Sequence, residues 1–448
     1  MAVFLNAARA DTLVEALIMA YQNNPTLQAQ RASLRATDES VPQALAGWRP
    51  NVDIVGDGGY NAEGGTGING VDQRGEYSGN LRITQNIYSG GGTVADVRRA
   101  ENTVRAERAR LAIAEQSVLL NAVQAYMNVY RDESVVQLNI NNERVLNRQL
   151  EATRDRFNVG EVTRTDVSQA EARLASARAA RVQAEGALQI SRGIYEQIIG
   201  KLPDALAKPE AIKQLPTSRQ ETIEVARKDN PSVVAADYDE RAARENVWVV
   251  QSDLLPKVDV VGQGGRGVNQ SSSNSTSDSG SVMAQLTVPL YEQGLTTSRV
   301  REAKQVVGRN RLLLIEAQRT ATEEATNAWE SLTSARAQIQ SLNAAVRSNR
   351  IALEGVRQES LVGSRTVLDV LDAEQELLNS EVNLVSAERD EIVAQYQLMS
   401  ALGRLTAQSM SLNTEYYDPE HHYKEVRDKL WGLGNDLDKT EPQPSGRK

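Results

Sequence analysis

The chain lacks cysteine and has few of the residues that carry catalysis or build thick cores. Its 448 residues include no cysteine, two histidines and two phenylalanines, and aromatic residues make up only 4% of the total. The absence of cysteine excludes disulfides, thiol catalysis, cysteine-ligated metals and acylation on cysteine. Large compact cores are built on aromatic and branched side chains, so a thick globular core is not expected.

Charge, hydropathy and histidine placement exclude further classes. The chain has 50 basic and 59 acidic residues, a net charge of −9, and an acidic chain without long basic blocks disfavours nucleic acid as a partner. No apolar run reaches the length of about 18 residues that a transmembrane helix needs. The only histidines, His421 and His422, are adjacent in a polar tail, where their spacing does not suit two facing metal ligands. We therefore predict neither an enzyme nor a cofactor.

The first ten residues are interpreted separately. Ala8-Arg9-Ala10 has the small-x-small form of a signal-peptidase site, directly before Asp11. The apolar stretch from Ala2 to Leu5 is too short for an ordinary signal peptide. We interpret residues 1–10 as a signal-peptide remnant or an artefact of the start; a chance match is the alternative.

The chain contains one unit twice. Asn24-Pro25 recurs as Asn230-Pro231, and the correspondence continues to Gly200 and Gly403. Self-similarity over this length indicates a duplicated architecture. The predicted organisation is repeat 1 at 11–200, an equatorial connector at 201–220, repeat 2 at 221–403, and an equatorial segment with a polar tail at 404–448.

Each repeat is predicted to hold a helix, a strand pair, a long helix, a tip and a return helix. The strand pairs are 50–60 with 76–88 and 256–265 with 281–291, the long helices 93–157 and 295–360, and the tips 158–165 and 361–366. Alternation within 76–88 puts Tyr77, Leu81, Ile83 and Ile87 on one face. That period of two predicts a strand with one apolar and one polar face. The loops 61–75 and 266–280 are predicted to be exposed and mobile.

The long helices have a heptad pattern. Val97, Val104 and Leu111 are seven residues apart, as are Val300, Val307 and Leu314 in the second repeat. A sustained heptad indicates a coiled coil or a helical barrel. A helix running from Gly92 to Gly160 spans roughly 100 Å at 1.5 Å per residue.

The pattern of the strands favours a pore over a solvated coiled-coil scaffold. A soluble sheet needs a second layer over its apolar face, and the narrow alanine-rich stripes of the helices are occupied by other helices. Strands with one apolar and one polar face are typical of transmembrane barrels. Four strands are too few to close a barrel, and open edges are not tolerated in lipid. Closure therefore requires several chains, and three would supply twelve strands, which lies within the known range for such barrels.

At this point the sequence resembles the TolC family of outer-membrane efflux and type I secretion channel proteins. The resemblance covers residues 11–403 and rests on the duplication, the Asn-Asn-Pro near the start, and the tip segment from Val362 to Glu374, which reads VGSRTVLDVLDAE. The resemblance implies an α+β membrane protein of the bacterial outer membrane. It would be a homotrimer with a 12-stranded transmembrane β-barrel, four strands per chain, that is continuous with a long periplasmic α-helical coiled-coil barrel. The implied partners are a periplasmic membrane-fusion adaptor, an inner-membrane transporter of RND or ABC type, and outer-membrane lipid.

The resemblance also suggests roles for the tips. Threefold symmetry would place Asp369 and Asp372 in rings of carboxylates that favour cations; the alternative is that they are ordinary first-turn acids of a helix. The family's closed-state lock joins an arginine at the second tip, here Arg365, to a Thr-Asp pair at the first, here Thr165 and Asp166. A family tyrosine that supports this lock is replaced by Ser360. The residues suggested for adaptor docking are Val159, Gly160, Thr163, Val362, Gly363 and Thr366.

The predicted function is therefore an export duct. It would pass substrates from the transporter and adaptor to the exterior through a gated tunnel, in a tripartite efflux pump or a type I secretion system. The alternative is a periplasmic coiled-coil adaptor or scaffold without a pore, which leaves the amphipathic strands unexplained. The sequence does not reveal the cargo, nor whether it is a drug or a protein.

Overall fold

The computed structural model describes residues 11–63, 72–210, 212, 215–272 and 274–433. In chain order the elements are α1 (Leu13–Asn23), α2 (Pro25–Asp38), α3 (Ser40–Leu45), the 3-10 turn η1 (Ala46–Trp48), β1 (Asn51–Glu63), β2 (Asp72–Ser89), α4 (Gly92–Asn158), α5 (Arg164–Ile199), α6 (Arg219–Asp229), α7 (Pro231–Ser252), β3 (Lys257–Val268), β4 (Thr276–Thr287), α8 (Leu295–Leu361), α9 (Val367–Ala401) and α10 (His421–Val426). The predicted tip at 361–366 begins inside the last turn of α8.

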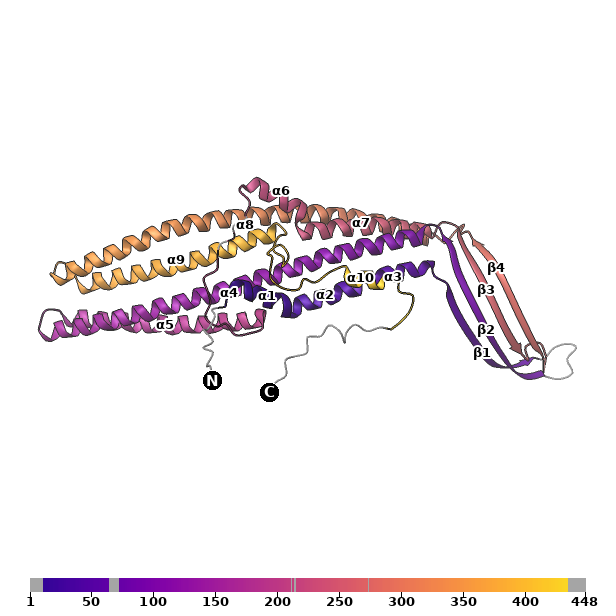
Figure 1. Cartoon of the computed structure of the whole chain (residues 1–448), viewed down its shortest axis with the longest axis horizontal. Helices are drawn as coiled ribbons and strands as arrows, with labels where there is room; N and C mark the ends of the chain where they lie inside the picture. Colours follow the sequence, from indigo (N-terminus) through magenta and orange to yellow (C-terminus); the bar gives the residue numbers. More distant parts are fainter. Residues whose placement is uncertain (1–10, 64–71, 211, 213–214, 273, 434–448) are drawn as a thin grey trace, which may run out of the picture. The chain divides into compact units, whose positions relative to one another are not determined.

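The chain divides into two compact units. Unit 1 consists of Met1–Arg31, Ala109–Val234 and Ile315–Tyr417, and unit 2 of Ala32–Arg108, Ala235–Leu314 and Asp418–Lys448. Unit 1 contains the two helical tips, and unit 2 contains the sheet (Figure 1). No helix of the described residues is long and apolar enough to cross a membrane.

The sheet is a single antiparallel layer with the order β1-β2-β3-β4 (Figure 1). Its register aligns Ile54 with Leu81 and Gly264, and Arg82 with Asp53 and Gln263. Residues directly opposite one another share a face, so apolar side chains collect on one face and polar ones on the other. This confirms the predicted alternation.

The described residues leave the apolar face of the sheet uncovered. Ile54 in β1 and Val282 in β4 are 82% and 80% exposed. The alternation is interrupted at Ile87, where a β-bulge puts Tyr88 in register with Val258. The bulge leaves Ile87 without a register partner, so the regular pairing of β2 is interrupted after Asn86.

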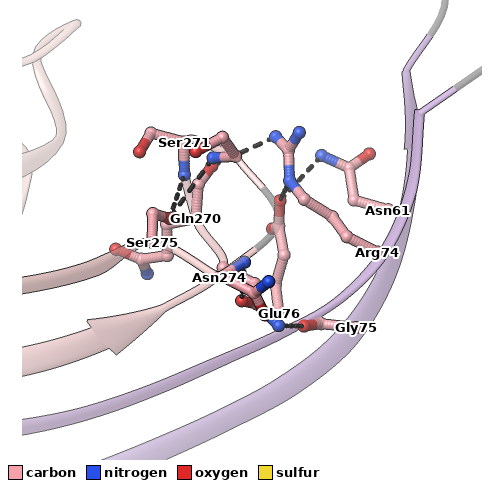
Figure 2. Close-up of polar contacts among 10 residues, drawn as sticks. Asn61, Arg74, Gly75, Glu76, Gln270, Ser271, Asn274 and Ser275 are labelled. Carbon is pink, nitrogen blue, oxygen red and sulfur yellow. Dashed lines mark hydrogen bonds and ion pairs between the residues drawn. The ribbon is translucent and has the colours of Figure 1, made fainter.

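Polar contacts tie the two hairpins together at the loop end of the sheet (Figure 2). Arg74 is buried; its Nε donates to Glu76 at 3.0 Å and its Nη2 donates to the carbonyl oxygen of Gln270 at 3.1 Å. The Asn269 amide donates to the carbonyl oxygen of Gly75 at 3.0 Å. The strands extend further than expected into the sequences 61–75 and 266–280, so the described turn between β3 and β4 is short and hydrogen-bonded.

In each repeat, the Asn-Pro pair divides the first helix and binds the end of the last one. Asn24 separates α1 from α2 and donates its amide to the carbonyl oxygen of Ile198 in α5 at 3.1 Å. Asn230 separates α6 from α7 and donates to Ala401 of α9, also at 3.1 Å. Proline removes a backbone donor, and the asparagine before it uses the break to hold the C-terminal turn of the return helix.

Two features hold the centre of unit 1. A buried cluster of alanines and leucines joins α6, α8 and α9 and is made of Ala226, Ala325, Ala328, Leu332, Ala394, Leu398, Ala401 and Leu402. The carboxylate of Glu115 in α4 accepts the N–H of Ala407 at 2.6 Å, which fixes the turn after the second repeat. Burial raises the pKa of Glu115, against the opposing effect of that hydrogen bond.

Because the pKa of Glu115 is raised, we predict that the stability of the folded chain depends on pH. A raised folded-state pKa means that the folded chain binds more protons than the unfolded one, so stability falls as pH rises from the ordinary glutamate value through the raised value. Glu115→Gln keeps an acceptor for Ala407 and removes the buried charge. We expect the melting temperature of the variant to exceed that of the parent by more at pH 8 than at pH 4.5, in thermal unfolding followed by circular dichroism. An equal difference at both pH values would contradict this.

Candidate functional site: the helical tips

Both helical hairpins reverse at a glycine with a left-handed backbone. Gly160 has φ +82° and Gly363 φ +80°. Their N–H groups donate to Phe157 and Ser360, while Glu161 and Ser364 donate to Arg156 and Glu359, so the last carbonyls of α4 and α8 are satisfied. L side chains rarely adopt this backbone conformation, so glycine is the residue that ends each long helix cleanly.

A threonine then starts each return helix with a capping box. The N–H and hydroxyl of Thr163 donate to Asp166 at 2.8 and 2.7 Å, and the Asp166 N–H donates back to Thr163 at 3.3 Å. The second tip repeats this with Thr366 and Asp369 at 2.9, 2.8 and 3.2 Å. The Thr-x-x-Asp spacing in the sequence is typical of a capping box, although we predicted docking, locking and gating roles for these residues.

The two aspartates suggested as gate rings have different surroundings. The backbone N–H and hydroxyl of Thr366 lower the pKa of Asp369, so its carboxylate stays charged. Asp372 lies one turn further along α9 and accepts from Arg173 of α5 at 2.5 Å. Within one chain Asp369 is thus the partner of the Thr366 cap in the first turn of α9, and the charge of Asp372 is offset by an arginine.

The proposed lock residues do not meet within one chain. Arg365 donates its Nε to Glu359 of the preceding helix at 2.9 Å. Asp166 is occupied by Thr163, and Thr165 lies exposed in the first turn of α5. Ser360, at the position of the family tyrosine, is buried and contributes only its carbonyl to the turn.

A small core joins the two hairpins behind the tips. It contains Leu146 and Leu150 of α4, Ala170, Leu174 and Ala177 of α5, and Val367 and Leu371 of α9. The Arg173–Asp372 pair spans the same junction between α5 and α9. The sequence offered no signal for this pair, because its members are 199 residues apart.

The turn residues suggested for adaptor docking lie beyond this core. Val159 and Val362 are 72% and 81% exposed, and each directly precedes the turn glycine. Each capped hairpin thus presents one exposed valine at its end, which makes a small apolar surface on each tip. Among the described residues, no group of three or more histidine, aspartate or glutamate side chains is arranged to hold a metal ion.

The long paired helices, the uncovered amphipathic sheet and the capped tips define an outer-membrane channel. The family described as outer membrane efflux protein matches residues 16–201 and 222–404, and the chain belongs to this family. It is 35% identical over 432 residues to the outer membrane efflux protein BepC of Brucella suis, covering 95% of this chain and 93% of that protein.

A second relative and a solved structure agree. The chain is 29% identical over 419 residues to the outer membrane protein TolC of Vibrio cholerae, covering 90% of this chain and 93% of that protein. Its fold matches the outer membrane channel CmeC of Campylobacter jejuni with a TM-score of 0.81 at 17% identity, covering 93% and 89% of the two chains. BepC is named as an efflux protein and CmeC as a channel.

Family and fold together establish the architecture. Three chains, each contributing four strands, close a transmembrane β-barrel in the bacterial outer membrane, and the helices continue it into the periplasm as a tunnel. The chain is an outer-membrane export duct. Nothing in these comparisons favours the alternative of an adaptor or scaffold without a pore.

The Arg173–Asp372 pair generates a prediction about ion selectivity. Arg173→Gln removes the cation that offsets Asp372, and we expect a higher preference for cations over anions. Asp372→Asn keeps the size of the side chain and removes its charge, so the preference should fall. Reversal potentials of the trimer in planar bilayers under a KCl gradient measure both. A shift of the same sign in the two variants would show that Asp372 does not face the ion path.

Proposed function

We propose that the two tips together form the periplasmic gate and docking end of the duct, in a tripartite system with an adaptor and an inner-membrane transporter of RND or ABC type. The observation that supports this most strongly is the contrast between the capped, hydrogen-bonded tip backbones and the exposed charged side chains on them. The capped backbones hold the opening in position, while exposed ion pairs can exchange partners at low cost in free energy. The barrel's apolar face contacts outer-membrane lipid.

Closure of the gate is proposed to use Arg365 with Thr165 and Asp166. Within one chain Arg365 is paired with Glu359, and Asp166 caps its own helix. The lock therefore requires contact between neighbouring copies, or an exchange of partners as the tips approach the threefold axis. Ser360 supplies no phenolic hydroxyl to support it, so the lock rests on exposed charges, which interact weakly one by one. Three symmetric copies open together when the adaptor displaces them.

Arg365 and Glu359 provide a matched test of the lock. Arg365→Ala removes the cation and is expected to raise the closed-state conductance of the trimer in planar bilayers several-fold, with greater sensitivity of cells to large antibiotics. Glu359→Gln removes only the partner within the hairpin and leaves Arg365 available for the lock, so conductance should stay at or below that of the parent. If both variants leaked equally, the pair within the hairpin, and not a lock between tips, would be what keeps the duct closed.

Docking is proposed at the two exposed turns, through Val159, Gly160 and Thr163 at the first tip and Val362, Gly363 and Thr366 at the second. Each turn combines an apolar side chain with a glycine that presents bare backbone. A partner that reads this surface would be sensitive to a charge placed at the glycine. The same surface occurs twice per chain, so a trimer offers six tips.

Gly363 allows charge to be separated from backbone strain. Asn and Asp have nearly the same size and both tolerate positive φ better than other side chains, so Gly363→Asn measures the strain and Gly363→Asp adds the charge. We expect Gly363→Asp to abolish both export and crosslinking to the adaptor in the native envelope, while Gly363→Asn retains most of both. The corresponding substitutions at Gly160 are expected to have the same effects. Intact crosslinking in the Asp variants would exclude the turns as the docking surface.

A further inference from the structure

The described chain ends in an exposed apolar segment. Leu430, Trp431 and Leu433 are 74%, 90% and 103% exposed, and they surround Gly432. Tryptophan and leucine are usually buried in folded proteins or located where a partner or a membrane covers them. Trp431 is the most exposed of the four tryptophans, because Trp48 and Trp248 are 40% and 63% exposed and Trp329 packs partly buried against the core of unit 1.

The segment starts from a fixed position, because α10 is packed onto unit 2. Tyr423 packs against a buried cluster of Val41, Ala44, Ala100 and Val104, and Val426 is buried. Polar contacts surround this apolar one. His422 Nδ1 lies 3.2 Å from the buried Asp38 carboxylate, Arg427 lies 3.2 Å from Glu101, and Arg108 lies 3.2 Å from Glu420.

A further contact places the segment beside the start of the sheet. Arg49, which lies between η1 and β1, donates its Nη1 to the carbonyl oxygen of Lys429 at 2.8 Å. β1 begins two residues later, at Asn51. The side chain of Arg49 therefore connects the residue before Leu430 to the start of the sheet. In Figure 1, α10 and the yellow segment after it lie next to α3, on the helical side of β1.

The same end of the sheet carries other aromatic side chains. Trp48 precedes β1, and Tyr88, which is 47% exposed, is the second-to-last residue of β2. Tryptophan and tyrosine concentrate at the level of the lipid headgroups, where an apolar ring and a polar group are both accommodated. The side chain of Lys429 is exposed and has no hydrogen bond or ion pair within the described residues, so it offers a cation at that level.

We propose that Leu430, Trp431 and Leu433 insert into the periplasmic leaflet of the outer membrane, with phospholipid as the occupant of this surface and Lys429 at its phosphate groups. The anchor lies outside the barrel wall and continues its lipid-facing surface at the periplasmic rim. This proposal rests on the proposed contact of the sheet's apolar face with outer-membrane lipid. Three copies per trimer act together, so their membrane affinities reinforce one another.

The absence of cysteine makes a single nitroxide label the direct test. Leu430→Cys keeps Trp431 in place; Val282→Cys on the apolar face of β4 is the lipid-exposed control, and Glu425→Cys on α10 is the water-exposed control. The labelled full-length trimers are reconstituted in phospholipid nanodiscs, and power saturation compares collision with oxygen, which partitions into lipid, and with a water-soluble nickel chelate. We expect positions 430 and 282 to favour oxygen several-fold and position 425 to favour nickel.

Each other result overturns the proposal in a distinguishable way. Nickel access at position 430 would place the segment in water. Low access to both reagents would mean that a second copy of the chain covers it. Nickel access at position 282 would refute the membrane position of the sheet itself. Trp431→Ser in the Leu430→Cys background should abolish the oxygen preference, whereas Trp431→Phe should preserve most of it; no change with serine would exclude Trp431 as the anchoring side chain.

Discussion

The open edges of the four-stranded sheet impose the constraint on which the rest of the structure depends. β1 and β4 each have only one neighbour within the chain, and the apolar face of the layer is uncovered. Unpaired backbone groups cost several kcal/mol each in the hydrocarbon core, so the layer is stable in lipid only when other copies pair with both edges. Association with other copies is thus a requirement of the sheet, and the helices attached to it are brought into a common tunnel wall.

The duplication supplies the same backbone structure twice, while the charged side chains at the tips differ between the two copies. Asn24 and Asn230 hold the return helices in the same way, and Thr163 and Thr366 cap them with the same geometry. These shared features fix the course of the backbone at both tips. The first tip carries the ion pair Arg156–Glu161 across its turn, and the second tip carries Glu359–Arg365. Asp372 contacts Arg173 of the other return helix, so charges concentrate where two nearly equivalent hairpins meet.

Some of this could be predicted from the sequence and some could not. The strand alternation and the long helices follow from local periodicity, and the turn glycines from backbone sterics. The bulge at Ile87 was missed because alternation in one strand does not reveal its register with the next. The capping boxes are local and were readable from Thr-x-x-Asp. The partner of Asp372 was not, because a contact across 199 residues depends on how α5 packs against α9.

The sequence by itself determined the two repeats, the amphipathic strands and the positions at which the helices reverse, since each depends on residues that are close along the chain. The tertiary structure decided which charges are neutralised and where the segment after α10 is held. The physical reason is that the strength of a charge or the exposure of a tryptophan depends on its neighbours in space. Those neighbours, such as Arg173 for Asp372 and Arg49 for the segment after α10, come from distant parts of the sequence.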